Sequence, residues 1–339
     1  MRILISGAGA VGAYAGAFWA RAGLDVTLCD PWPAHVDAIQ RDGVRITGSQ
    51  GDDRVRVTAL HVGELQAVFD PFDVVVLAPK TYDTEWMARL VAPHLAADGY
   101  VICAQNGLPD QRAASVLGAR RVLGCVIAGM ETAVWEPGTV IRGGAIGRDA
   151  GTIVFKLGEL DGSGERARQA ATLFDHIDAA TTTSDLAAER WSKLVQNAMS
   201  HPLPALTGLG DRELADDPRA RAIRQQLATE GARVGLAQRL ALGKIAGVAG
   251  EVWAHPEHAG NADAIATRLR QAKATDWKTS MQQDIVKGRR TEIEDLNGTI
   301  VRRGRELGIA TPMNDAIARA VRDVEAKRAP VGADHLRIA

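Results

Sequence analysis

Short apolar runs alternate with longer amphipathic segments over the first half of the chain. Ile3 to Ile5 and Val26 to Cys29 are two short strand-like runs, and Ala13 to Ala22 between them has a helical pattern. Asp73 to Pro79 and Gly99 to Ala104 are continuous apolar runs, typical of parallel strands that are covered on both faces. The alternation predicts a doubly wound parallel sheet, in which ligands bind at the carboxyl ends of the strands.

Short, glycine-containing strand patterns follow from Val122 to Leu157. Within them, Glu136-Pro-Gly-Thr139 has proline and glycine at the two central positions that a type II turn prefers. We therefore expect antiparallel strands that extend the sheet.

Helical patterns occupy nearly all of the chain from Thr183 to Lys327. The periodicity predicts helices over Ala187 to Met199, Ala264 to Val286 and Thr291 to Leu307, the last one ended by Gly308. The chain should thus have two domains, residues 1–181 with the parallel sheet and residues 182–339 built from helices.

The glycines at the end of the first predicted strand have the spacing G-x-G-x-x-G, as Gly7, Gly9 and Gly12. The first allows a tight turn, the second lets a pyrophosphate approach the backbone, and the third lets the helix pack closely on the strand. Ala10 and Val11 then open a helix whose N–H groups face the phosphates. The motif lies between a predicted strand and a predicted helix, which favours a Rossmann-type dinucleotide site over an ordinary glycine-rich turn.

Asp30 ends the second predicted strand, eighteen residues after Gly12. A carboxylate there accepts hydrogen bonds from the ribose hydroxyls of NAD and repels the 2′-phosphate of NADP. No lysine or arginine lies between Cys29 and Gln40 to offset that repulsion. The sequence therefore predicts NAD as the preferred cofactor.

Composition excludes some classes of partner. With 40 basic and 41 acidic residues, the net charge of -1 gives no electrostatic reason to expect nucleic acid or an anionic membrane. The three cysteines have no metal-binding spacing and lie in or beside strand patterns, as expected for free thiols in a reducing compartment. Apart from the glycine-motif region, no run of about 20 apolar residues occurs. We expect a cytoplasmic protein with a small-molecule substrate, and a homodimer stays open.

Three polar clusters are candidates for chemistry. Lys80 and the amides Gln105 and Asn106 each follow a predicted buried strand, where an exposed loop lysine and an Asn-Gly turn are the simpler alternatives. Lys193, Asn197 and His201 are spaced by four, so they lie along one face of a predicted helix. Apolar residues flank that face, which suggests a helix packed over much of its circumference rather than a solvated stripe.

These motifs resemble the 2-dehydropantoate 2-reductase (ketopantoate reductase) family. The resemblance rests on the glycine motif, on Gln105-Asn106-Gly107, on Lys193 to Asn197 continuing into Pro202 to Gly208, and on Ser280 to Asp284 and Gly288 to Gly298. It covers nearly the whole chain in the same order. It implies a Rossmann-type domain followed by an all-helical domain, as in 6-phosphogluconate dehydrogenase, and hydride transfer between a nicotinamide cofactor, NADP included, and a 2-oxo or 2-hydroxy acid.

The resemblance also implies roles for residues at the matching positions. Lys193 matches the general acid, Asn106 and Asn197 match ligands of the carbonyl and substrate, and Glu292 matches a carboxylate that holds substrate and lysine. Ser280 matches a hydrogen-bonding partner of the substrate, and Lys80 matches a strand-end lysine near the cofactor. An ammonium group suits this reaction, because negative charge grows on the carbonyl oxygen as hydride arrives. Substrate is expected in the cleft between the domains.

Two positions depart from the family pattern. Asp30 stands where these reductases usually have an arginine for the 2′-phosphate, and His201 stands where an asparagine usually contacts substrate. His201 could reshape the pocket and present charge to an anionic substrate, or it could cap the helix end before Pro202. These departures leave open another branched or bulky 2-oxo or 2-hydroxy acid, in place of ketopantoate.

Three functional hypotheses therefore remain. The first is a ketopantoate reductase-like enzyme, the second an NAD-dependent dehydrogenase of another hydroxy acid or alcohol, and the third a protein that senses NAD(H) without turnover. A sensor needs no proton donor, so Lys193, Asn197 and Glu292 favour an enzyme. His255 and His258 are also spaced for a metal, but no third ligand is evident, and we expect a loop and helix cap without metal.

Overall fold

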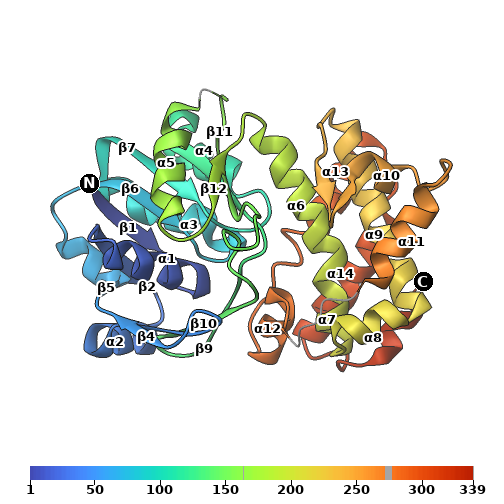
Figure 1. Ribbon diagram of the computed structural model, residues 1–339, viewed down its shortest axis with the longest axis horizontal. Helices are drawn as coiled ribbons and strands as arrows, with labels where there is room; N and C mark the ends of the chain where they lie inside the picture. The colour runs from blue at the N-terminus through green and yellow to red at the C-terminus, as the bar shows by residue number, and fades with distance from the viewer. Residues whose placement is uncertain (163, 272–276, 339) are drawn as a thin grey trace. The chain divides into compact units, whose positions relative to one another are not determined.

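The computed structural model describes residues 1–162, 164–271 and 277–338. It divides into two compact units, Met1–Leu186 and Ala187–Ala339 (Figure 1). The first contains a large sheet with helices, and the second is built mainly from helices, which confirms the predicted fold class. Among the described residues, no helix is long and apolar enough to cross a membrane.

An eight-stranded sheet forms the centre of the first unit, with strand order β12-β11-β8-β7-β6-β1-β2-β5. All neighbours pair in parallel except β8 and β11, which are antiparallel. The strands are β1 (Arg2–Ser6), β2 (Asp25–Asp30), β5 (Thr58–His61), β6 (Phe72–Leu77), β7 (Leu95–Cys103), β8 (Val122–Ile127), β11 (Phe155–Glu159) and β12 (Ala180–Thr182).

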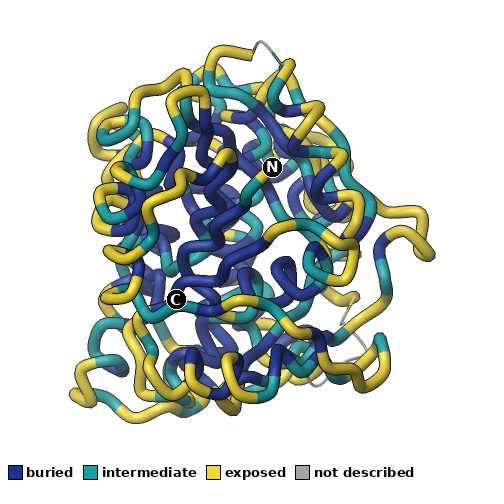
Figure 2. The backbone as a smooth tube through the Cα atoms, turned by 90° about the vertical axis from the view of Figure 1, so that its left-hand side faces the viewer, coloured by how far each residue is buried: buried dark blue, intermediate teal, exposed yellow. Residues whose placement is uncertain are grey.

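Helices cover both faces of this sheet, as in a doubly wound fold. They are α1 (Ala10–Arg21), α2 (Pro33–Asp42), α3 (Thr84–Val91), α4 (Asp110–Leu117) and α5 (Glu165–Asp175). Ile3 and Ile5 join a core with α1 and α5, whereas Leu4 between them joins a second core with α3 and α4. Figure 2 shows buried stretches of the backbone in dark blue and exposed connections in yellow. Because successive side chains of a strand alternate between faces, a strand covered on both sides is apolar throughout.

A second, four-stranded sheet in the same unit corrects one expectation. Strands β9 (Glu131–Glu136) and β10 (Thr139–Gly143) do not extend the large sheet; they pair with β3 (Val44–Gly48) and β4 (Asp53–Val55) in the order β4-β3-β10-β9. Pairing of β10 with β3 joins segments far apart in sequence, which local patterns do not reveal. The turn between β9 and β10 has Gly138 at φ 73°, as a type II turn requires at its third residue.

The second unit has nine helices among the described residues, with α9 at its centre. They are α6 (Leu186–Ser200, whose first residue closes the first unit), α7 (Pro202–Thr207), α8 (Asp211–Asp216), α9 (Pro218–Ala237), α10 (Gly250–Ala254), α11 (Asn261–Arg270), α12 (Ser280–Val286), α13 (Asn297–Leu307) and α14 (Pro312–Glu325). Helix α9 packs against α8, α10, α11, α13 and α14. A small hairpin of β13 (Lys244–Ile245) and β14 (Val248–Ala249) interrupts the helical pattern.

Two predicted helices are shorter than expected. The segment from Ala264 to Val286 is not one helix, because α11 ends at Arg270 and α12 begins at Ser280 after Thr279, whose side chain accepts a hydrogen bond from the main-chain N–H of Gln282. The expected part of this helix at residues 272–276 lies outside the described residues.

Helix α13 begins at Asn297 rather than at Thr291. Leu296, with φ -103° and ψ -95°, is not helical, and the preceding residues form turns. Glu292 therefore lies in a turn, not on a helix. The helix ends at Gly308 in the left-handed conformation, as predicted.

Candidate functional site

Main-chain hydrogen bonds bring the predicted cofactor-binding segments to one edge of the large sheet. The N–H of Gly7 donates to the carbonyl of Cys29 (2.8 Å), and the N–H of Ala78 donates to that of Ser6 (2.9 Å). Ala104 donates in the same way to Leu77. The loops after β1, β2, β6 and β7 thus lie side by side at the carboxyl ends of the strands, where doubly wound folds bind ligands.

The glycine loop has the geometry that the motif predicts. Gly7 has φ 96°, and a Cβ atom there would lie 2.5 Å from the nitrogen of Pro79, so the loops after β1 and β6 approach closely. A Cβ atom on Gly12 would lie 2.1 Å from the carbonyl oxygen of Gly7. A Cβ atom on Gly9, in contrast, would meet nothing within 4 Å. Gly7 and Gly12 are therefore required by packing, whereas the space at Gly9 is open to a ligand.

Helix α1 starts directly after this open position. Gly9 is its N-cap and supplies no side-chain cap, and the first turn, which contains Ala10 and Val11, holds no acidic residue. The first N–H groups of a helix lack partners within the helix, and their dipoles favour an anion. The loop and helix therefore fit the pyrophosphate of a dinucleotide.

Asp30 is the last residue of β2, next to the glycine loop, and is only 9% exposed. One oxygen of its carboxylate accepts a hydrogen bond from the main-chain N–H of Trp32 (2.9 Å). That bond orients the carboxylate at the position where Rossmann folds hold the ribose.

Lys80 and Asn106 lie in two loops that are hydrogen-bonded to each other. The hydroxyl of Thr81 donates to the carbonyl of Asn106 (2.7 Å), and both predicted residues are half-buried. Gln105 is buried, and its amide donates to the hydroxyl of Thr84 (2.6 Å). Of the two neighbouring amides, Asn106 is thus the better candidate for ligand contact, and Gln105 holds the loop in place.

His35, which no sequence motif indicated, holds the glycine loop through a side-chain hydrogen bond. Its buried imidazole accepts a hydrogen bond at Nδ1 from the N–H of Gly138 (2.9 Å), so the proton lies on Nε2, which donates to the carbonyl of Ala8 (2.8 Å). The ring stacks on Trp32, with centroids 5.2 Å apart and planes at 6°. His35 thereby joins the glycine loop to the β9–β10 turn. The β9–β10 turn is far from His35 along the chain, so no local sequence pattern indicates this role.

The three cysteines of this unit lie in its core. Cys29, Cys103 and Cys125 are buried and none of them is in a disulfide, which confirms the prediction of core thiols. Burial, assisted by the nearby negative charge of Asp30, raises the pKa of the Cys29 thiol to about 12. A thiol with such a pKa is protonated near neutral pH and a poor nucleophile.

Helix α6 carries Lys193 and Asn197 and is packed over most of its circumference, as the sequence analysis proposed. Asn197 is 1% exposed, whereas Lys193 is half-buried. The indole N–H of Trp191 donates to the carbonyl of Gly231 on α9 (2.9 Å). A Cβ atom on Gly235 would lie 2.6 Å from the Trp191 ring, so α9 needs glycine where α6 approaches. This packing fixes the rotation of α6 and hence the side on which Lys193 emerges.

His201 and Ser280, both predicted to contact substrate, lie next to each other. The Nδ1 atom of His201 is 3.4 Å from the hydroxyl oxygen of Ser280 at the start of α12. His201 precedes α7, but its side chain does not cap that helix. The N–H of His201 instead closes the last turn of α6 on the carbonyl of Asn197 (2.9 Å). The imidazole therefore lies beside Ser280, and it does not cap α7.

Glu292 is 4% exposed in the turns that precede α13. The neighbouring Asn297, fully buried, donates through its amide to the carbonyl of Ala198 on α6 and to the side-chain oxygen of Asn314 on α14, both at 3.0 Å. Asn314 in turn donates to the carboxylate of Glu230 on α9 (2.7 Å). This chain of hydrogen bonds connects the Glu292 segment to α6, and no periodic pattern in the sequence indicates it.

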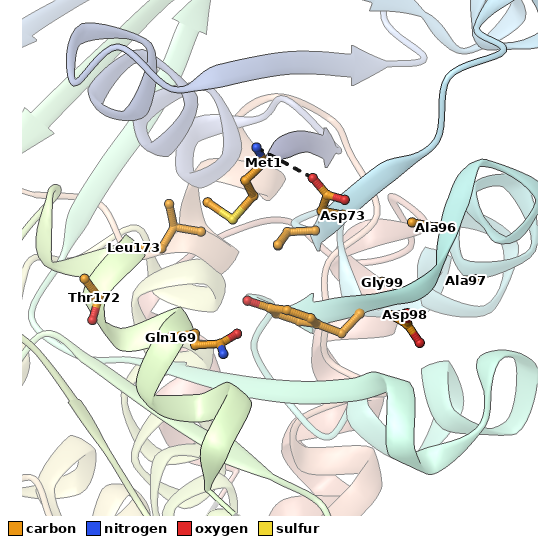
Figure 3. Close-up of a pocket in the computed structure, with 11 residues that line it drawn as sticks. Met1, Asp73, Ala96, Ala97, Asp98, Gly99, Gln169, Thr172 and Leu173 are labelled. Atoms are coloured by element: carbon orange, nitrogen blue, oxygen red, sulfur yellow. Dashed lines mark ion pairs between the residues drawn. The ribbon is translucent and has the colours of Figure 1, made fainter.

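A pocket of about 640 Å³ lies at the opposite, amino-terminal edge of the large sheet. Figure 3 shows it between Met1, the starts of β6 and β7, and α5, with the terminal ammonium of Met1 3.8 Å from the carboxylate of Asp73. No residue predicted to bind cofactor or substrate lines it. This pocket is therefore distinct from the candidate site.

Both parts of the chain match one protein family. The family described as "Ketopantoate reductase PanE/ApbA" matches residues 3–150, and its C-terminal counterpart matches residues 185–325. The chain belongs to this family. It is therefore an oxidoreductase of the ketopantoate reductase type, which confirms the resemblance found in the sequence.

Relatives and solved structures agree with this assignment. A 2-dehydropantoate 2-reductase of Mesorhizobium japonicum is 30% identical and covers 97% of this chain and 99% of its own. The crystal structure of a ketopantoate reductase from Ralstonia eutropha is 29% identical, with a TM-score of 0.78 over 97% of this chain and 99% of that one. D-mandelate dehydrogenase with NADH and anilino(oxo)acetate has a TM-score of 0.80 over 96% and 99% of the two chains, but at 22% identity it shows the shared fold alone.

The hydrogen bonds of His35 lead to a first testable prediction. His35→Phe keeps an aromatic ring beside Trp32 but leaves the carbonyl of Ala8 and the N–H of Gly138 without their partner. Each buried unpaired group costs about 1–3 kcal/mol, so the free energy of unfolding should fall measurably in denaturant titrations. The KM for nicotinamide cofactor should also rise, because the glycine loop loses its support.

The exposed His176→Phe is the matched control and should change neither quantity. Unfolding and KM values of His35→Phe equal to those of the wild type would show that His35 does not support the loop.

Proposed function

We propose that this protein reduces 2-dehydropantoate, or a closely related bulky 2-oxo acid, to the 2-hydroxy acid with NADH as the preferred reductant. Membership of the ketopantoate reductase family over both parts of the chain is the observation that carries the proposal. Cytoplasmic location, homodimeric assembly and, for 2-dehydropantoate, a role in pantothenate biosynthesis belong to the same proposal.

The residues at the carboxyl edge of the large sheet bind the cofactor in this proposal. The N–H groups of Ala10 and Val11 hold the pyrophosphate beside Gly9, and Asp30 accepts hydrogen bonds from the ribose hydroxyls. Lys80 and Asn106 line the same edge. The reduced nicotinamide supplies a hydride to the substrate's carbonyl carbon.

Lys193 supplies the proton in this proposal. As the carbonyl carbon receives the hydride, the oxygen gains negative charge, which the ammonium stabilises before donating a proton to form the hydroxyl. The oxidised cofactor and the 2-hydroxy acid are the products, and the neutral amine is reprotonated by solvent. Glu292 holds the lysine and substrate, and Asn197 donates its amide to the substrate.

The substrate's remaining polar groups contact Ser280 and His201 in this proposal. Their contact of 3.4 Å supports a shared role, because a ligand that contacts one of these side chains lies within reach of the other. An imidazole is larger than the asparagine of the family pattern and changes charge near neutral pH. A substrate other than ketopantoate is therefore the main alternative, and the shared fold of D-mandelate dehydrogenase shows that this scaffold also serves another hydroxy acid. A sensor without turnover is the alternative of a different class.

The proposed function is tested by following absorbance of NADH and NADPH with a panel of 2-oxo acids. We expect turnover with at least one branched acid and a higher kcat/KM with NADH, because Asp30 repels a 2′-phosphate. Asp30→Ala should lower the ratio of kcat/KM with NADH to kcat/KM with NADPH. Asp25→Ala, at the exposed start of the same strand, is the control and should leave it unchanged.

Two results would refute parts of this proposal. Cofactor binding without turnover on every acid would favour the sensor. Equal or better kcat/KM with NADPH would show that Asp30 does not select the cofactor.

Replacing the proton donor gives a second prediction for this reaction. Lys193→Ala should lower kcat by about 10²- to 10⁴-fold, the usual contribution of a positioned general acid, and leave cofactor affinity nearly unchanged. The exposed Lys244→Ala is the control. Near-normal turnover of Lys193→Ala would contradict the assignment of the general acid.

His201→Asn restores the asparagine of the family pattern and should shift preference toward ketopantoate. A pocket contact of this size changes kcat/KM ratios by about ten- to two-hundred-fold. The pH dependence of KM should also change, because the titrating imidazole is gone. Kinetics on several 2-oxo acids at different pH values test this, and an unchanged ranking with an unchanged profile would make His201 structural.

A further inference from the structure

The turn after α10 brings together three side chains of the kinds that bind transition metals. Atoms of His255, Glu257 and His258 able to act as ligands all lie within 4.8 Å of one another. The sequence predicts no metal here, because only His255 and His258 have a spacing suited to ligands. Glu257 supplies the third, since the turn folds it back toward His255.

Several hydrogen bonds hold the backbone of this turn. The N–H of His258 donates to the carbonyl of His255 (3.1 Å), to which the amide of Asn261 also donates (2.8 Å). The guanidinium of Arg233, from α9, donates to the carbonyl of Ala254 (2.7 Å). The three candidate ligands are thus carried on a chain segment whose course is already set, which lowers the entropy cost of metal binding.

The carboxylate of Glu257 is oriented with one oxygen toward the histidines. Its Oε1 lies 3.3 Å from Nδ1 of His255, and its Oε2 is 3.1 Å from a guanidinium nitrogen of Arg233. Metal-binding carboxylates are commonly held in this way by an outer partner.

The two imidazole rings are stacked, with centroids 4.7 Å apart and planes at 6°. Lone pairs of parallel rings do not converge, so the rings must rotate to bind one ion. With zinc–nitrogen bonds of about 2.0–2.1 Å at tetrahedral angles, the ligand atoms would approach to about 3.4 Å. The side chain of His255 is 34% exposed and His258 is exposed, so solvent leaves room for this rotation.

We propose that His255, Glu257 and His258 bind one divalent zinc ion on the surface of the second unit, with water as the fourth ligand. Two imidazoles and one carboxylate suit zinc better than magnesium or calcium, which prefer oxygen ligands alone. The positive charge of Arg233 opposes the ion and makes the affinity moderate. None of the residues assigned to hydride transfer belongs to this site, so the proposal is independent of the function proposed above.

Titration of metal-free protein with zinc chloride in a calorimeter tests the site. We expect one zinc ion to bind per chain with moderate affinity. The zinc affinity should fall by about tenfold or more in each of the variants His255→Ala, His258→Ala and Glu257→Gln. Because both histidines and the glutamate reach solvent, these variants should fold, which circular dichroism checks. His176→Ala removes an exposed histidine of the first unit and is the control.

A magnesium titration under the same conditions should show no binding at this site. Wild-type zinc affinity in His258→Ala and His255→Ala, or zinc binding lowered equally by His176→Ala, would overturn the proposal. The first result would place the ion elsewhere, and the second would show dispersed binding to surface histidines.

Discussion

Hydrogen bonding between β1 and its parallel neighbours, β2 and β6, is the constraint on which the candidate cofactor site depends. The pairing of Ser6 with Cys29 and with Leu77 brings the ends of three strands into line. The glycine loop, Asp30 and Lys80 each follow directly from one of these ends. Their common location therefore results from strand register, and a shift of one residue would turn each strand's buried side chains to the other face.

Close packing at the glycines strengthens this arrangement. Gly7 lets the loop after β6 approach, and Gly12 lets α1 lie against its own loop. His35 also holds Ala8, through a hydrogen bond that requires the proton on Nε2. Of the three glycines in the motif, only Gly9 has open space beside its backbone, and a ligand can approach there.

In the second unit, packing of α6 on α9 determines where Lys193 lies, as strand register determines the positions of the cofactor residues in the first. Helix α6 has few exposed positions, and the half-buried Lys193 is one of the few charged groups it presents. Asn297 fixes the end of α6 from α13, and Glu230 connects the same group of hydrogen bonds to α9 and α14. A buried amide of this kind specifies one arrangement of helices, because any other arrangement leaves it without partners.

The parallel sheet, the dinucleotide loop and the run of helices could all be predicted from the amino-acid sequence. These features depend on local geometry: glycines where the backbone must turn or approach closely, apolar runs where both faces are covered, and residues four apart on one helix face. The family resemblance added the roles expected of Lys193, Asn197 and Glu292.

The pairing of distant segments is visible only in the tertiary structure. It shows β9 and β10 in a second sheet, the end of α11 before the start of α12, and Glu292 in a turn. It also gave His35 its partners Ala8 and Gly138, and it brought His201 to Ser280. Periodicity in a sequence reports which face of an element is buried. It does not report which other element covers that face, because that choice depends on contacts between residues that are far apart along the chain.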